Sequence, residues 1–95
     1  MNRQKRFASV WDALEGPEDA VNLKARAEVA STLIDEIERR GLTQRQAASL
    51  LGVTQPRVSD LVRGRLDLFS LDTLIEMAGR AGFKIGIRIS RRRAA

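Results

Sequence analysis

The spacing of apolar positions predicts that most of this 95-residue chain is helical. From about Glu18 to Arg40, apolar side chains recur every three or four residues and charges lie mostly opposite, so we expect a long amphipathic helix that Gly41 ends. Its expected apolar face consists of Leu23, Ala27, Ala30, Leu33, Ile34 and Ile37. The same period returns after Ser70, a suitable N-cap, and stops at Gly82. The expected inward side chains there are Leu71, Leu74, Ile75, Ala78 and Ala81.

Between these helices, residues 42–64 predict two shorter helices joined by a tight turn. Thr43 and Gln46 have the spacing of a capping box, and Gly52 suits the end of the first helix. Thr54 can cap the second helix, and Pro56 fits its first turn, where a missing N–H costs little. The crossing of two such short helices needs a small residue, and the expected one is Ala48. A helical hairpin used only for packing is the alternative interpretation.

The two ends of the chain carry different patterns. One face of a short helix is predicted from Phe7, Val10, Trp11 and Leu14, and residues 16–17, Gly-Pro, break it. Near the other end, Ile85, Ile87 and Ile89 alternate with polar or small residues, which predicts a strand with one apolar face. Because a lone strand leaves its backbone groups unpaired, we expect it to pair with a second copy of the chain, the alternative being a disordered tail.

These patterns predict an all-α fold, which is a bundle of about five helices with a single C-terminal β-strand used in dimerisation. The expected organisation is a basic arm and short amphipathic helix over 1–17, a helical domain over 18–82 with its central motif at 43–63, and a strand and basic tail over 83–95. A chain of this length has room for one core.

Composition excludes most catalytic chemistry. The chain has no histidine, cysteine or tyrosine, which removes the commonest general base, the strongest nucleophile and the usual zinc ligands. We therefore expect no enzyme, no cofactor and no metal site. No apolar run approaches the length of a membrane span and no signal-peptide pattern follows the basic start, so a cytoplasmic protein with no membrane partner is expected.

Charge favours a polyanionic partner, since the net charge is +5. The positive charge is concentrated on the central motif and the two termini, and a single acid, Asp60, stands between residues 42 and 66. The basic residues of that stretch are Arg45, Arg57, Arg63 and Arg65.

The central motif resembles the XRE family of Cro-like and phage-repressor-like helix-turn-helix regulators. The residues that carry this resemblance are Gln44, Ala48, Gly52, Val53, Val58 and Leu61. Over about residues 7–90 the chain looks like the antitoxin (HigA-like) subgroup, which is encoded beside RelE/ParE-like or HigB-like toxins. The resemblance implies a homodimeric repressor that binds a palindromic DNA operator, autoregulates its operon and neutralises a cognate toxin. Two alternatives are a stand-alone prophage-type repressor and a protein-interaction module that inhibits an enzyme without binding DNA.

The resemblance also implies roles for individual side chains. The implied DNA base contacts are Gln55, Arg57, Ser59 and Asp60. The implied phosphate contacts are Gln44, Thr54, Arg63 and Arg65. These roles agree with side-chain chemistry, because arginine and glutamine make paired hydrogen bonds to guanine and adenine edges. Asp60 is suited to cytosine N4 or to orienting Arg57 or Arg63. The apolar face around Trp11 is either a cap folded onto the same subunit or a surface for the toxin or for dimerisation.

Overall fold

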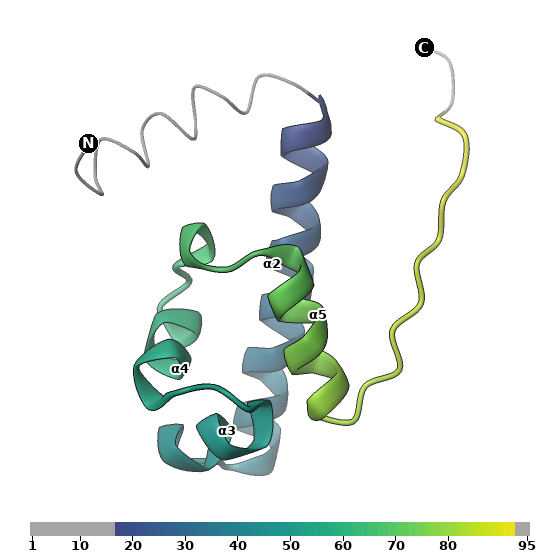
Figure 1. The fold of residues 1–95 in the computed structure, drawn as a ribbon. Helices are drawn as coiled ribbons and strands as arrows, with labels where there is room; N and C mark the ends of the chain where they lie inside the picture. Colours follow the sequence, from purple (N-terminus) through teal and green to yellow (C-terminus); the bar gives the residue numbers. More distant parts are fainter. Residues whose placement is uncertain (1–16, 93–95) are drawn as a thin grey trace, which may run out of the picture.

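The computed structural model describes residues 17–92 and shows a small helical bundle (Figure 1). Its elements are α2 (Pro17–Arg40), α3 (Gln44–Leu51), α4 (Gln55–Val62), the short 3-10 helix η1 (Leu66–Leu68) and α5 (Leu71–Arg80). The all-helical class is confirmed, but the described part of the chain holds four α-helices rather than about five. The short helix expected over residues 7–14 lies outside the described residues.

Helices α2 and α5 pack side by side and run in the same direction, and α3 and α4 cover one side of the pair (Figure 1). One continuous apolar core joins all four helices and the segment before α5. Its buried members are Ala30, Leu33, Ile37, Ala47, Ala48, Leu51, Val58, Leu61, Phe69, Leu74, Met77, Ala78 and Ala81. Ala48 is 9% exposed, in line with its expected place where α3 and α4 meet. Ala27, by contrast, is exposed, so the expected apolar face of α2 was wrong at that position.

The turn between α3 and α4 confirms the roles of Thr43, Gln46 and Gly52. The Thr43 hydroxyl accepts from the Gln46 backbone N–H at 3.1 Å, and the Gln46 amide oxygen accepts from the Thr43 N–H at 2.9 Å. Gly52 takes φ 71°, the left-handed conformation that ends the helix. A Cβ at residue 52 would also lie 2.7 Å from the Arg80 side chain, which reaches over this turn from α5. Glycine is therefore required here for its φ, whereas the flexible end of the exposed Arg80 side chain can move aside from an added Cβ.

The expected position of Thr54 as the N-cap of α4 is confirmed, but the side-chain hydrogen bond of a cap is not present. Thr54 has the extended backbone of an N-cap. Its backbone carbonyl accepts the first bonds of α4, from Arg57 at 3.1 Å and Val58 at 3.2 Å. The Thr54 hydroxyl stays exposed at the start of the helix.

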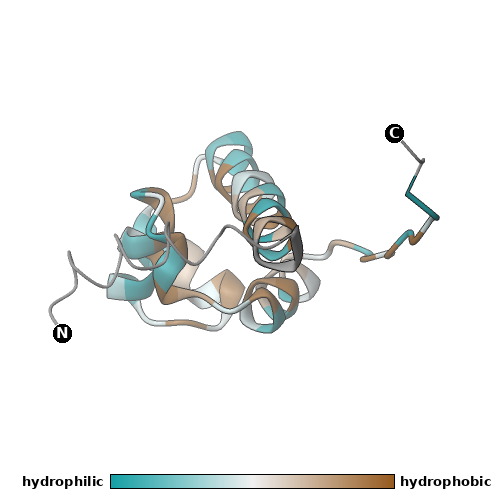
Figure 2. Ribbon diagram, turned by 90° about the horizontal axis from the view of Figure 1, so that it is seen from above, coloured by the Kyte–Doolittle hydropathy of each residue, from teal (hydrophilic) through white to brown (hydrophobic). Residues whose placement is uncertain are grey.

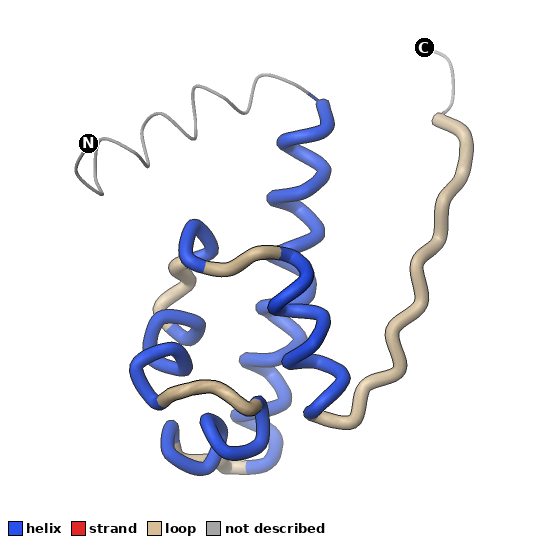
Figure 3. The backbone as a smooth tube through the Cα atoms, in the orientation of Figure 1, coloured by secondary structure: helices blue, strands red, loops and turns tan. Residues whose placement is uncertain are grey.

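The expected C-terminal strand is not present in the described residues. Residues 83–92 are extended coil, coloured as loop in Figure 3, and no segment among residues 17–92 pairs with them. The physical reason is that a strand is defined by a partner, and the fold offers this segment none within one chain. Ile85, Ile87 and Ile89 are 41%, 77% and 90% exposed. Figure 2 shows the segment leaving the helical body, with apolar and polar positions alternating along it.

None of the described helices is both long enough and apolar enough to span a membrane.

Two arginines in the last turn of α2 bind a carboxylate one turn earlier on the same helix. Glu36 accepts from Arg39, with Nη2 to Oε2 at 2.6 Å, and from Nε of Arg40. The hydrogen bond from Arg39, then that from Arg40, lowers the pKa of Glu36 from its ordinary value of 4.5 to about 2. Arg40 also donates to the Ala81 carbonyl at 2.9 Å, which ties the end of α2 to the end of α5.

We expect this pair to give the protein a pH-dependent increment of stability. A carboxyl whose pKa is lowered on folding stabilises the fold above its unfolded pKa, and this contribution disappears as the pH falls towards about 2. The stability difference between wild type and Glu36→Gln should therefore shrink as urea denaturation is repeated from about pH 6 to about pH 2, and it should be smaller in high salt. Ser31→Ala, a change at an exposed uncharged residue of the same helix, should show no such trend.

Candidate nucleic-acid interface

The outward surface of α3 and α4 begins with three exposed polar side chains at the helix starts. Gln44 is the first residue of α3, and Thr54 and Gln55 are the N-cap and first residue of α4. All three are exposed. Because the first turn of a helix presents unpaired N–H groups, side chains here lie where a phosphate or a base edge can be bound. Their placement fits the contacts expected for them.

Farther along α4, Ser59 and Asp60 are half-buried, between the apolar face and the solvent. The apolar face itself is fixed by Val58 and Leu61, both 0% exposed. Asp60 forms no ion pair with Arg57 or Arg63 in the described part of the chain, so an orienting role towards either arginine finds no contact here. Its carboxylate is left to accept a hydrogen bond from outside the protein.

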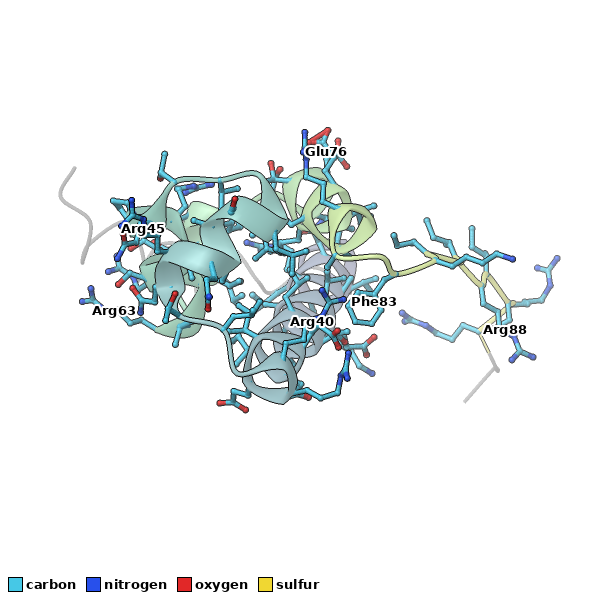
Figure 4. The ribbon with its side chains drawn as sticks, turned by 90° about the horizontal axis from the view of Figure 1, so that it is seen from below. Arg40, Arg45, Arg63, Glu76, Phe83 and Arg88 are labelled. Atoms are coloured by element: carbon cyan, nitrogen blue, oxygen red, sulfur yellow. The ribbon has the colours of Figure 1, made fainter. Side chains whose placement is uncertain are left out.

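The end of α4 carries the basic side chains. Arg63 is the C-cap of α4 and is exposed. Figure 4 places Arg63 and Arg45 of α3 on the same side of the molecule, away from Arg88 of the C-terminal segment. Arg45 contributes to the charge of the motif, but the sequence predicts no contact for it. Its exposure on the same side of the molecule as Arg63 makes it a further candidate for a phosphate, which only the relative placement of α3 and α4 reveals.

Arg65 lies just past α4 and is partly neutralised. Its Nε is 3.6 Å from Oδ1 of Asp67, a carboxylate that is 7% exposed. The backbone N–H of Arg65 donates to the Asp60 carbonyl at 3.0 Å, which keeps the residue at the end of the helix. A phosphate could still reach its side chain, which is 36% exposed.

Arg57 corrects the sequence-based assignment. Instead of projecting into solvent for a base edge, its Nη1 donates to the Leu68 carbonyl at 3.0 Å. Its guanidinium carbon also lies 4.1 Å from the centre of the Phe69 ring, a cation–π contact. The reason is that the chain after α4 turns back along the helix and offers Arg57 a carbonyl and a ring, which the spacing within the motif does not reveal. This geometry does not support Arg57 as a base contact.

The arrangement of α3 and α4 defines a helix-turn-helix, the unit that presents its second helix to the major groove of DNA. A helix-turn-helix domain family, HTH_37, matches residues 14–90, so the chain belongs to that family. A solved structure of an XRE-family transcriptional regulator is similar over 81% of this chain and 90% of its own, with 32% sequence identity and a TM-score of 0.75. Among curated proteins, none is detectably similar. The chain is an XRE-type helix-turn-helix DNA-binding regulator.

Proposed function

We propose that the chain represses transcription, including that of its own operon, by binding a palindromic operator as a homodimer. The observation that carries this proposal is the set of exposed polar and basic side chains on the outer surface of α3 and α4, from Gln44 to Arg63, on a rigid apolar support. The exposed arginines of this surface argue against a module that has lost DNA binding.

The proposal can be tested without knowing the operator. Selection of bound sequences from a randomised DNA duplex library should enrich a site with two inverted halves, because a two-fold dimer presents two copies of α4. A selected duplex then serves as the probe for titrations. No enrichment over the starting library would contradict sequence-specific binding.

Gln55 and Arg63 should differ in what they contribute to that binding. Gln55→Ala should cost about 1–3 kcal/mol on the selected duplex and relax the preference at one base pair. Arg63→Ala should weaken binding to selected and unrelated duplexes alike and lower the slope of log K against log salt by about one. Fluorescence anisotropy at several salt concentrations measures both effects. Unchanged affinity and slope in both variants would mean that α4 does not dock as proposed.

The homodimer is proposed from the C-terminal segment. Its backbone is extended but unpaired within the described residues, and three isoleucines occupy every second position (Figure 2). An isolated extended segment gains hydrogen bonds and buries these side chains if it pairs with the same segment of a second copy. Such pairing would also supply the two-fold symmetry that a palindromic operator requires.

We further propose an antitoxin role, in which the chain neutralises a RelE/ParE-like or HigB-like toxin. Support comes from the resemblance of the sequence flanking the motif to that subgroup, and a stand-alone repressor is the alternative. The candidate toxin contacts Phe7, Val10, Trp11 and Leu14 lie outside the described residues. The neighbouring open reading frame tests the idea, since a small basic ribonuclease-like product that co-purifies with this chain is expected, and its absence favours the stand-alone repressor.

A further inference from the structure

The connector between α4 and α5 (residues 65–69) is held by two arginines from different helices. From α2, Arg26 Nη1 donates to the Leu66 carbonyl at 2.8 Å and to the Phe69 carbonyl at 3.5 Å. From α4, Arg57 Nη1 donates to the Leu68 carbonyl at 3.0 Å and stacks on the Phe69 ring. Three carbonyls of one short segment are therefore bound by two guanidinium groups.

This arrangement fixes the Arg57 side chain as well as the connector. Phe69 is 2% exposed and belongs to the core, so its ring is a fixed surface on which the guanidinium stacks. A planar guanidinium can satisfy a carbonyl and stack on a ring at the same time, which a lysine ammonium cannot do equally well. A short 3-10 turn has few hydrogen bonds of its own, so external donors decide its conformation.

We propose that Arg57 is a positioning residue that clamps the connector against α4 and does not itself read the DNA. The group that it positions is Arg65, the first residue of the connector. Arg65 follows the end of α4, and its side chain is expected to bind a phosphate. The inference rests on the proposed DNA binding. If Arg57 acts in this way, its loss should weaken the affinity for every DNA sequence by the same factor.

Arg26→Ala provides the matched control, because Arg26 acts on the same connector from α2. If both arginines act through the connector, Arg57→Ala and Arg26→Ala should each weaken binding to the selected duplex by about tenfold and leave the ranking of single-base variants of that duplex unchanged. Loss of discrimination at one base pair in Arg57→Ala alone would overturn the proposal. So would a large effect of Arg57→Ala beside no effect of Arg26→Ala.

The salt dependence separates positioning from a direct phosphate contact. Arg65→Ala should lower the slope of log K against log salt by about one, and Arg57→Ala should lower it by a similar or smaller amount. In the double variant the two losses should not add, since Arg57 acts through Arg65. Additive losses would show that Arg57 meets a phosphate of its own. A defect of stability alone would not change the slope.

Hydrogen exchange tests the clamp without DNA. The Leu68 backbone N–H donates to the Arg65 carbonyl at 3.0 Å, and the Phe69 N–H donates to the Leu66 carbonyl at 3.2 Å. The exchange rates of both amides therefore report on the conformation of the connector. We expect both to exchange about tenfold faster in Arg57→Ala, with the amides of α3 unchanged. Unchanged exchange at both amides would overturn the clamp even if DNA binding holds. If Arg57→Ala unfolds, Arg57→Lys, which keeps the charge and loses the fork, replaces it in all three experiments, with a smaller loss expected.

Discussion

Leu61→Ala should destabilise the domain by about 2–5 kcal/mol, a large share of what so small a core supplies. Leu61 is 0% exposed and lies on the inner face of α4, within the core that α2 and α5 also form. Truncation of its side chain leaves a cavity beneath α4, and neighbouring side chains in a helical bundle fill such a cavity only in part. Urea denaturation followed by circular dichroism measures the loss.

Val62→Ala is the matched control because Val62 is the next residue on the same helix and is 43% exposed. Its effect on stability should stay within about 0.5 kcal/mol, because exposed positions rarely contribute more. A similar midpoint shift in the two variants would mean that α4 is not held through the face that the structure assigns to it.

The helices of this fold are those that local sequence can specify. The capping box at Thr43, the left-handed glycine at residue 52 and the apolar spacing of α4 act within one or two turns, so α3 and α4 begin and end within a residue or two of their predicted bounds. The buried set was less complete. Met77 and Phe69, 2% exposed each, were not among the expected core residues. Phe69 lies in a connector without helical period, so no pattern indicates which way it faces.

Contacts between distant segments could not be predicted in the same way. The partners of Arg57 are 11 and 12 residues farther along the chain, beyond a turn whose path depends on Arg26 of α2. Residue type alone makes any exposed arginine on a helix-turn-helix a candidate for DNA. Arg57 is bound by the connector, whereas Arg63 at the end of α4 is exposed. The C-terminal segment shows the same limit at a larger scale, since the pairing proposed for it depends on a second molecule.

Ile87→Asp should convert the proposed homodimer into monomers while the helical domain stays folded. In a single chain Ile87 is 77% exposed and lies beyond the helices, so a carboxylate there has no reason to disturb the core. In a paired strand the same position would place two charges in an apolar interface, which is severely unfavourable. Operator binding should fall at least about a hundredfold, because each half-site would then be bound separately.

Sedimentation velocity and thermal unfolding together separate the outcomes for this segment. Arg88→Gln, a change at the adjacent residue on the opposite face, should leave the sedimentation coefficient of the dimer unchanged. Ile87→Asp should sediment as a monomer with the helical content of wild type. If Ile87→Asp remains dimeric, residues 83–92 do not form the dimer interface and the two-fold contact must lie on the helical domain. If wild type is monomeric at all concentrations, the proposed homodimer is wrong, and the selected DNA site should then contain a single half-site.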